Sequence, residues 1–390
     1  MFNVSVLASN IKKFRIAKGL SQSALANALL ITPQSVSKWE CGASVPDIEN
    51  LCAISDFLGV SLDALLSHSS ERKKIMIGID GGGTKTDFVM FTEDGAILET
   101  YSDGPCNPNS IGIEACAEML IKGINFLISA NSGVCGIYIG SAGFLLGNNA
   151  PEIKKILKAH YPHIKIACAT DILNVAASAT VEDNCIAAIC GTGSAVLVKE
   201  GEKHTLLGGW GFLLSKAGSG YDIGRDGLHA ALGDLNGLSP HTKITPLITA
   251  KIGSNISDII SVVYNKDPSF VASFTTCVFE AYEAGDEIAE KILCENAKAI
   301  ADTINTGFKD YSCGNKLVLS GGIITKNQVF PELMKQYLDP NIDVIIPQHP
   351  QVLGACIMCA KRCGVSTEGL IENLAKQYAK ETLQICLKQK

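Results

Sequence analysis

An aspartate followed by three glycines carries the most chemical information in this sequence. The apolar run 75–79 ends on Asp80, glycines occupy positions 81 to 83, and a β-rich run follows at 87–91. Consecutive glycines let the backbone approach a ligand closely and leave its N–H groups free to bind an anion. An aspartate before such a turn can hold Mg²⁺ through water, because Mg²⁺ prefers few carboxylates together with phosphate oxygens. The segment therefore predicts a nucleotide-phosphate site at a hairpin.

Two other phosphate motifs fit this sequence poorly. The pattern G-x-x-x-x-G-K-[ST] is absent, and a Rossmann turn would open a helix, whereas 87–91 is rich in β-forming residues. The run 218–224 resembles a dinucleotide fingerprint, but its last spacing is one residue too long. The hairpin interpretation is therefore favoured over a Rossmann site.

A second glycine turn echoes the first one. Residues 185–198 repeat the plan of strand, Gly/Thr turn and strand, with the turn at Gly191-Thr192-Gly193-Ser194. Either turn alone would be read as an ordinary hairpin. Two such hairpins, one in each half, can face each other across a cleft and hold a polyphosphate, so the pair favours the phosphate site.

Length, composition and charge limit the class of protein. The chain has 390 residues, 47% hydrophobic and 18% charged, which predicts two or three globular domains. Its net charge of −6 gives no overall basic field, so any contact with DNA must come from a local surface. The N-terminus lacks a basic stretch leading into an apolar core, and no long apolar span follows. We therefore expect a cytoplasmic protein without a membrane partner.

The 15 cysteines are expected to be reduced in that compartment. Cys356, Cys359 and Cys363 have a spacing that places them on one face of an apolar helix. They fit either small buried core residues or part of an iron–sulfur or zinc ligand set. No fourth ligand lies near in sequence, which favours the core.

The chain divides into a helical start and a longer α/β part. Residues 1–67 predict five short helices whose start and stop signals are typical of a helix-turn-helix domain. Ser21 and Thr32 suit N-caps, and Pro33 suits a first helical position. Residues 68–74 are polar and predict a linker. The remainder alternates strands (75–80, 87–91, 96–101, 134–140, 164–169, 185–190, 195–199, 316–320, 342–346) with helices (112–129, 151–159, 172–179, 220–232, 270–310, 327–337, 352–363, 367–388), an α/β pattern with two sheets.

The motifs of this second part resemble those of a known superfamily. Asp80 to Thr86, then Gly191 to Ser194, then Leu319 to Gly322 resemble the first-phosphate, second-phosphate and adenosine motifs of the actin-like ATPases. The segments 104–107, 170–171 and 208–214 look like the N-acetylglucosamine kinase branch, grouped with the BadF/BadG/BcrA/BcrD ATPases. The resemblance covers about residues 75–365. It implies a two-lobed actin-like (ribonuclease H-like) α/β fold, with lobe I at 75–180 and lobe II at 181–390, whose C-terminal helix returns to lobe I.

The resemblance also implies roles for single residues. ATP and Mg²⁺ are the expected cofactors, with Asp80 holding the metal through water and Asp171 acting as general base on the acceptor hydroxyl. Asp171 also suits a helix N-cap. Phosphoryl transfer is mostly positioning and electrostatics, with one carboxylate near the attacking hydroxyl, which agrees with this assignment. The phosphates and adenosine would be bound by Gly81, Gly82, Gly83, Thr84, Lys85, Gly191, Thr192, Gly193, Ser194, Gly321 and Gly322, and the substrate by Asn107, Asp171, Ser194 and Lys216.

One stretch departs from the family pattern. After Gly-Trp-Gly-Phe-Leu-Leu the family usually continues Gly-Asp-Glu-Gly-Ser, with acidic groups that receive sugar hydroxyls, whereas this chain has Ser215-Lys216-Ala217-Gly218-Ser219. A site that hydrogen-bonds hydroxyls discriminates strongly through those groups. The change therefore points either to an acidic or phosphorylated sugar on Lys216, or to a copy that binds ligand without turnover.

Residues 10–66 resemble the Cro/C1-type (XRE) helix-turn-helix domain through the segments 11–15, 19–22, 25–26 and 35–40, with Gly42 and Pro46. The resemblance implies binding to double-stranded DNA. The residues expected at the DNA are Gln22, Thr32, Gln34, Ser35, Ser37 and Lys38. A domain with balanced charges should bind weakly as a monomer, so a homodimer on a palindromic operator is expected. A helical bundle for protein interaction is the alternative.

These observations favour a sugar-responsive transcription regulator with an ATP-dependent sugar kinase module. Two other functions stay open. One is a non-catalytic sensor of ATP and sugar. The other is a dehydratase-activator ATPase, which would need iron–sulfur ligands at a dimer interface.

Overall fold

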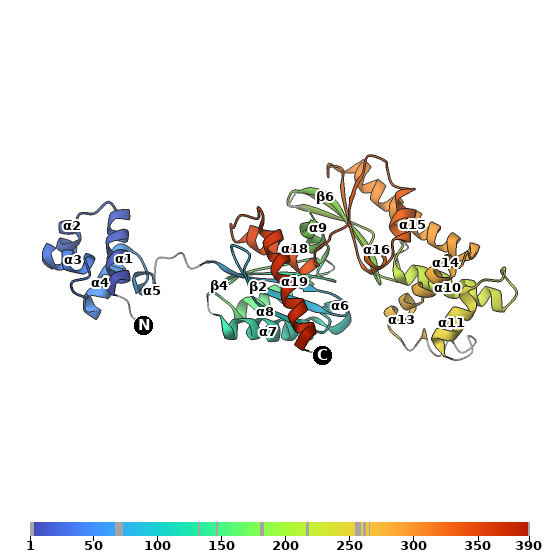
Figure 1. Cartoon of the computed structure of the whole chain (residues 1–390), viewed down its shortest axis with the longest axis horizontal. Helices are drawn as coiled ribbons and strands as arrows, with labels where there is room; N and C mark the ends of the chain where they lie inside the picture. Colours follow the sequence, from blue (N-terminus) through green and yellow to red (C-terminus); the bar gives the residue numbers. More distant parts are fainter. Residues whose placement is uncertain are drawn as a thin grey trace. The chain divides into compact units, whose positions relative to one another are not determined.

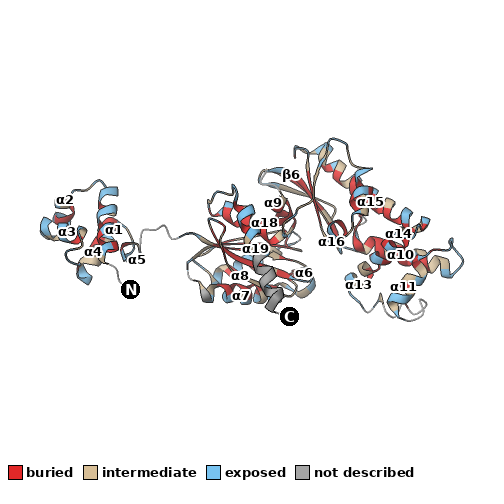
Figure 2. Cartoon of the chain, viewed as in Figure 1, coloured by how far each residue is buried: buried red, intermediate tan, exposed pale blue. Residues whose placement is uncertain are grey.

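The computed structural model describes residues 4–66, 73–131, 133–145, 147–179, 183–215, 218–253, 259, 263–264 and 266–388. The chain divides into two compact units, Met1–Lys73 and Lys74–Lys390 (Figure 1). Residues 68–72 of the predicted linker lie outside the described residues. In each unit the buried residues gather inside, between the helices or between helices and sheets (Figure 2).

The N-terminal unit contains the five helices that the sequence predicts, namely α1 (Val4–Ala17), α2 (Gln22–Ala28), α3 (Pro33–Glu40), α4 (Ile48–Leu58) and α5 (Leu62–Leu66). The predicted start signals form as expected, since the Ser21 hydroxyl accepts from the Ala24 N–H and the Thr32 hydroxyl from the Ser35 N–H. Apolar side chains from the helices close one small core: Leu7, Ile11, Leu25, Val36, Trp39, Ile54, Leu58 and Leu65.

The tight turn between α2 and α3 contains a leucine in an unusual conformation. Leu30 has φ +55° and is 93% exposed. Among the described residues it alone combines a side chain with positive φ, a region that favours glycine. The backbone of this turn is therefore strained by the residue that occupies it.

The second unit contains two five-stranded sheets of the same design. The first has the order β3-β2-β1-β4-β5, in which β1, β2 and β3 pair antiparallel while β4 and β5 extend the sheet parallel to β1. Its strands are β1 (Ile75–Gly81), β2 (Thr86–Thr92), β3 (Ile97–Asp103), β4 (Val134–Ser141) and β5 (Lys165–Ala169). A glycine turn at 82–85 joins β1 to β2.

The second sheet repeats this arrangement in the order β10-β9-β6-β7-β8. The strands are β6 (Asn184–Cys190), β7 (Ser194–Glu200), β8 (Lys203–Leu207), β9 (Lys316–Ser320) and β10 (Asp343–Ile345). The β6–β7–β8 strands are antiparallel, and β9 and β10 are parallel to β6. The internal repeat predicted from the two glycine turns is therefore present in the topology.

Helices cover both faces of the first sheet. One face packs against α7 (Ile113–Ala130) and α8 (Asn149–His160), which follow the four-residue helix α6 (Pro108–Ile111). The other face packs against α18 (Gln351–Arg362) and α19 (Leu370–Lys388). The last two helices of the chain therefore pack on the sheet formed by residues 75–169, and Cys356, Cys359 and Cys363 lie buried in this core.

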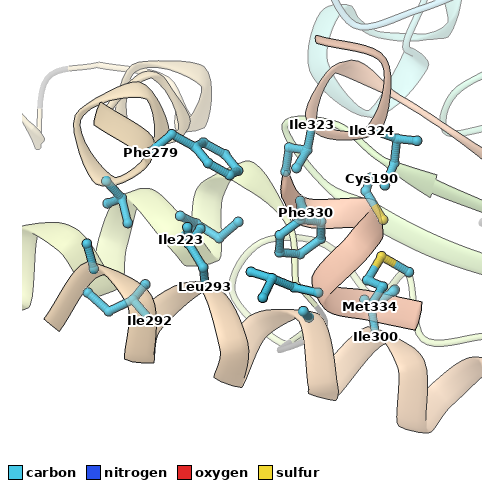
Figure 3. Close-up of a cluster of buried hydrophobic side chains, with 14 of the residues drawn as sticks. Cys190, Ile223, Phe279, Ile292, Leu293, Ile300, Ile323, Ile324, Phe330 and Met334 are labelled. Carbon is cyan, nitrogen blue, oxygen red and sulfur yellow. The ribbon is translucent and has the colours of Figure 1, made fainter. Parts of the chain in front are cut away.

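The second sheet has α9 (Ile172–Ala179) on one face and a larger helical layer on the other. That layer contains α10 (Gly220–Leu235), α11 (Ile244–Ile252), α13 (Pro268–Ser273), α14 (Thr275–Glu283), α15 (Glu287–Asp310), α16 (Gly322–Lys326) and α17 (Val329–Lys335). Figure 3 shows Leu293 and Ile300 of α15 beside Ile223 of α10 and Phe330 and Met334 of α17 in one apolar cluster. This packing holds the turn ends of β6 and β9 in place.

The structure corrects several predicted elements. The single helix expected at 270–310 is three helices, α13 to α15. The break before α15 arises because Gly285 has φ +76° and Asp286 caps α15 by accepting from the Ala289 N–H. The helix expected at 327–337 is α17, which begins at Val329. The sequence did not predict the elements α6, β8, α11 and α16. The last helix begins at Leu370 rather than 367, because Gly369 has φ +65°.

No helix in the described ranges has the length and hydropathy needed to cross a bilayer.

Candidate functional site

The first glycine turn is held firmly at its base and is open at its tip. The Gly82 N–H donates to the Lys85 carbonyl at 2.8 Å, and the Cys106 N–H donates to the Gly82 carbonyl at 3.0 Å. A Cβ at Gly81 would lie 2.5 Å from the Ser141 hydroxyl oxygen, so this glycine is required by packing. A Cβ at Gly83 would meet open space. Within the described ranges, the N–H groups of Gly83 and Thr84 donate to no protein oxygen.

Lys85 follows the open tip of this turn. Its ammonium group lies 2.7 Å from Asp87 and its side chain is 59% exposed. Because the pair is exposed, it is weak in water, and Lys85 keeps the freedom to turn toward a bound anion.

Asp80 lies at the end of β1 and is held by a residue from α9. The Asn174 side chain donates from Nδ2 to Asp80 Oδ1 at 2.6 Å and to the Gly140 carbonyl at 3.2 Å. Burial raises the pKa of Asp80 to about 7; the Asn174 hydrogen bond and Lys85 oppose the shift, whereas Asp171 and Asp87 add to it. A cation beside Asp80 would favour the ionised form.

Asp171 lies where β5 leads into α9. Its carboxylate accepts from the Thr170 hydroxyl at 3.0 Å, and its carbonyl accepts from the Asn174 N–H at 2.8 Å. Burial raises the pKa of Asp171, while the Thr170 hydroxyl and backbone N–H groups at the helix start lower it. A partly buried carboxylate with a raised pKa is suited to accept a proton from a hydroxyl group.

Asn107 caps the short helix α6. Its Oδ1 accepts from the Asn109 N–H at 3.0 Å. The neighbouring Gly143 has φ +79°, and a Cβ there would lie 2.3 Å from Asn107 Oδ1. The loop after β3 and the loop after β4 thus meet at Asn107, directly after Cys106, which bonds to the first glycine turn.

The second glycine turn joins β6 to β7 and packs on α10. The Gly191 carbonyl accepts from the Gly220 N–H at 2.8 Å, and the Thr192 carbonyl from the Tyr221 N–H at 3.0 Å. Within the described ranges, the N–H groups of Thr192 and Gly193 donate to no protein oxygen. The Ser194 hydroxyl is buried and has no hydrogen-bond partner there. An orphaned buried hydroxyl beside open N–H groups fits a ligand with acceptor oxygens.

The third motif is the glycine pair after β9. Gly321 has φ +101°, and a Cβ there would lie 2.4 Å from the Cys190 carbonyl oxygen, beside the second glycine turn. Gly322 begins α16, and a Cβ there would meet open space. The Ser320 hydroxyl accepts from Gln351 of α18 at 2.9 Å.

The predicted residues form two groups that α9 connects. The first comprises Asp80, the first glycine turn, Asn107 and Asp171 on the first sheet. The second comprises Gly191 to Ser194 with Gly321 and Gly322 on the second sheet. Asn174 of α9 donates a hydrogen bond to Asp80 in the first group. Apolar residues of the same helix, Ile172 and Leu173, pack in a cluster with Ile189 of β6 and Ala195 of β7, next to the second group.

Not every predicted residue can be placed. Lys216 and Ala217 lie outside the described residues. The preceding loop is described, and its apolar side chains are exposed: Trp210 is 61% and Leu214 81% exposed. The Phe212 ring contacts Tyr221 of α10 at a centroid distance of 5.0 Å.

The expected DNA-binding residues of the N-terminal unit fall into two kinds. Gln34, Ser37 and Lys38 are exposed on α3. Thr32 and Ser35 bond to each other at the start of that helix, and Gln22 donates to Glu40 at 2.8 Å. The Glu40 carboxylate also accepts hydrogen bonds from Nε and Nη2 of Arg15. Gln22 therefore belongs to a partly buried hydrogen-bond network that joins α1, α2 and α3.

Sequence reasoning missed Asn174 and Ser141. Ser141 donates to the Gly81 carbonyl at 3.1 Å and also to the Cys106 carbonyl, which ties the first turn to the loop before Asn107. Asn174 lies three residues after Asp171 on a largely apolar helix, and a lone amide side chain in such a helix is the signal that could have identified it.

The residues fit a nucleotide with its metal. The two turns offer unpaired N–H groups, and Asp80 offers a fixed carboxylate. Among the described residues, no three or more His, Cys, Asp or Glu side chains come together in a way that could hold a metal ion.

The repeated sheets with a glycine turn on each define the class of two-lobed actin-like ATPases. Residues 77–359 match the BadF/BadG/BcrA/BcrD ATPase family, and residues 11–65 match a helix-turn-helix family. The chain therefore belongs to the BadF/BadG/BcrA/BcrD ATPase family and carries an N-terminal helix-turn-helix domain.

Known proteins resemble each of the two parts. An N-acetylmuramic acid/N-acetylglucosamine kinase from Clostridium acetobutylicum is 28% identical over 305 residues, covering 74% of this chain and 99% of that protein. The crystal structure of a candidate N-acetylglucosamine kinase from Porphyromonas gingivalis is 22% identical with a TM-score of 0.59, covering 75% of this chain and 100% of the other. YonR, an uncharacterized HTH-type transcriptional regulator from the SPbeta prophage of Bacillus subtilis, is 43% identical over 61 residues, covering 16% of this chain and 56% of that protein.

Proposed function

We propose that this protein is a DNA-binding transcription regulator whose effector module phosphorylates an amino sugar or a related sugar with ATP. The observation that carries the proposal is Asp171 at the start of α9, the same helix whose Asn174 holds Asp80. One short helix thus positions a candidate base and a candidate metal-binding carboxylate. Both ATP and operator DNA are available in the cytoplasm, where we expect the protein to act.

The chemistry follows from the residues of the chain. Asp171 accepts the proton of the attacking sugar hydroxyl, and the open N–H groups of the two glycine turns bind phosphate oxygens. Asp80 would hold Mg²⁺ through water, and the bound metal would neutralise phosphate charge. Gly322 leaves room for adenosine beside α16, and Asn107 positions the sugar.

The substrate class follows from the departure at 215–219. A lysine where the family pattern has an acid favours a sugar with an anionic group. The Clostridium acetobutylicum relative is named for two sugars, one of which is an acid. We therefore propose an acidic or phosphorylated amino sugar. The variant Lys216→Asp with Ala217→Glu should shift preference toward neutral N-acetylhexosamines, and an unchanged ranking of sugars would contradict this.

The test of catalysis compares Asp171→Asn with wild type across a panel of sugars and sugar phosphates with Mg·ATP. We expect loss of phosphoryl transfer with nearly unchanged ATP affinity, because the base acts on the acceptor. Asp302→Asn on the exposed face of α15 is the matched control and should keep full activity. Equal residual turnover in wild type and Asp171→Asn would instead support a second candidate, a sensor that binds ATP and sugar without turnover. The replacement of the family's Asp-Glu pair by Lys216 and Ala217 favours this candidate.

The DNA-binding part of the proposal rests on the exposed face of α3. Lys38→Met should weaken operator binding across all sequences and reduce its salt dependence, whereas Gln34→Ala should relax specificity at one base position. We propose that the protein binds as a homodimer to a palindromic operator, and the stoichiometry of the complex with a selected operator tests this.

A further inference from the structure

Two cysteines meet beside the first glycine turn. The sulfur atoms of Cys106 and Cys116 lie 2.9 Å apart, and both side chains are fully buried in the core between the first sheet and α7. A disulfide bond has a sulfur–sulfur length of about 2.05 Å. A movement of less than about 1 Å would therefore bring the two sulfur atoms to bonding distance.

Cys106 belongs to the connections that hold the candidate site together. Its N–H donates to the Gly82 carbonyl at 3.0 Å, and its carbonyl accepts from the Ser141 hydroxyl. Cys116 lies near the start of α7, and the segment between the two cysteines contains Asn107 and the short helix α6. A bond between the two sulfur atoms would thus close a loop that contains Asn107 and would tie it to α7.

The two thiols differ in acidity and can divide the chemistry between them. The hydrogen bond with Cys116 lowers the pKa of Cys106, although burial opposes this shift. The same hydrogen bond, together with burial, raises the pKa of Cys116. Because the thiolate is the nucleophile in cysteine chemistry, Cys106 is suited to react first. Gly104 and Asn107 beside it are only half-buried, so a local opening of this loop can admit a small oxidant.

We propose that Cys106 and Cys116 are a redox-sensitive thiol pair, which hydrogen peroxide converts to a disulfide bond in the folded protein. The Cys106 sulfur attacks one peroxide oxygen, the O–O bond breaks, and the leaving hydroxide takes up the Cys106 proton as water. The Cys116 sulfur then attacks the sulfur of the sulfenic acid, the S–O bond breaks, and the leaving hydroxide takes up the Cys116 proton. Two thiols and one peroxide thus give one disulfide and two water molecules.

The disulfide should loosen the first glycine turn. The helix α7 has 18 residues and packs on the sheet, so the short loop at Cys106 moves toward α7. This movement lengthens the bond from the Cys106 N–H to the Gly82 carbonyl. Loss of one such hydrogen bond corresponds to a change in affinity of about 2- to 10-fold. The effect on Mg·ATP rests on the proposed function, whereas formation of the disulfide does not.

Peptide mapping of the full chain tests the disulfide. The protein is reduced, freed of reductant, and treated with hydrogen peroxide or with diamide, which accepts the two thiol hydrogens without adding oxygen. The remaining thiols are alkylated before digestion. Cleavage after glutamate places Cys106 in peptide 100–114 and Cys116 in peptide 115–118, and a disulfide joins these two peptides. We expect the joined peptides from oxidised, folded wild type.

Variants locate the bond. The joined peptides should be absent from Cys116→Ala and from Cys106→Ser, which keeps the backbone N–H and serves if the first variant does not fold. Cys277→Ala removes a buried thiol on α14 and is the matched control, which should form the disulfide as wild type does. Thermal unfolding verifies that each variant folds. Absence of the joined peptides, or their appearance only after unfolding in urea, would overturn the proposal.

Hydrogen exchange and ATP titration test the consequence. Oxidation should speed exchange of the Cys106 amide and lower the affinity for Mg·ATP by about 2- to 10-fold in wild type, with neither effect in Cys116→Ala. Unchanged exchange in a protein that carries the disulfide would overturn the link to the glycine turn. If reduced wild type binds no Mg·ATP, the proposed function fails, while peptide mapping and hydrogen exchange still decide the thiol pair.

Discussion

Asn174 donates its side-chain amide to the carboxylate of Asp80 at 2.6 Å, and this bond joins α9 to the end of β1. Asn174 is fully buried, and its Oδ1 has no hydrogen-bond partner among the described residues. A Cβ at Gly140 would lie 2.1 Å from that oxygen, so β4 leaves space for the amide. The site therefore depends on a residue that fixes a carboxylate without lying in any of the glycine motifs.

Asn174→Ala should weaken Mg·ATP binding by about 10- to 100-fold, since a hydrogen bond to a charged group contributes about 1.5–3 kcal/mol. Ser178→Ala is the matched control, because Ser178 is buried on the same helix and its hydroxyl donates to the Val175 carbonyl of that helix. Calorimetric titration of both variants with Mg·ATP measures the difference. Equal affinities for Asn174→Ala and wild type would show that Asp80 needs no such support.

The two glycines after β9 should respond differently to a methyl group. Gly321→Ala forces φ +101° on an alanine and brings its Cβ to 2.4 Å from the Cys190 carbonyl oxygen, so this variant should lower the thermal stability strongly. Gly322→Ala meets open space in the protein and should leave stability unchanged or higher, because alanine favours a helix. If adenosine lies there, Gly322→Ala should still raise KM for ATP. Equal thermal stability of the two variants would contradict this distinction.

Local signals explain which parts could be predicted from the sequence. The glycine turns, the strands around them and the caps at Ser21 and Thr32 depend on residues within a few positions, and these were predicted correctly. The bond between Asn174 and Asp80 spans 94 residues, and no local pattern specifies such a pair. The break between α14 and α15 inside the helix expected at 270–310 was predictable, because Gly285 and Asp286 are helix stop and start signals.

Acid should weaken the N-terminal unit through Glu40. Burial opposes the charge on Glu40, but hydrogen bonds from Arg15 and Gln22 outweigh it, so the pKa of Glu40 lies below its ordinary value. A lowered pKa in the folded state contributes stability that is present at neutral pH and is lost as the pH falls below about 4.5 and through the folded-state pKa. Urea unfolding followed by Trp39 fluorescence, in a Trp210→Phe background, measures this unit.

The variant Glu40→Gln should unfold more easily at pH 7 and should lose most of the acid dependence of wild type. Asp56→Asn, at an exposed position of α4, is the matched control and should keep it. An acid dependence identical in Glu40→Gln and wild type would assign the effect to other carboxylates.

Leu30→Gly should stabilise the same unit. The left-handed backbone of a non-glycine residue costs about 1–2 kcal/mol, and glycine removes that cost while adding freedom to the unfolded chain. We expect a net gain of about 1 kcal/mol in the free energy of unfolding. Leu30→Ala removes the exposed side chain but keeps the strain, so it should bring no comparable gain. A loss of stability in Leu30→Gly would mean that the leucine makes contacts that outweigh its backbone conformation.

The last prediction concerns coupling between the regulator and the kinase module. If sugar binding controls transcription, sugar must change the affinity for operator DNA, with a coupling free energy of about 1–3 kcal/mol. Linkage then requires that operator DNA change sugar affinity by the same factor. Sugar titrations with and without a selected operator measure that factor. The salt concentration is held constant, because salt alone changes the affinity for DNA. The variant Lys38→Met, which should bind the operator more weakly, supplies the control: at a DNA concentration that saturates wild type but not the variant, added DNA should have a smaller effect on its sugar affinity. Identical sugar affinities with operator demonstrably bound to wild type would show that the two modules are joined in one chain without being coupled.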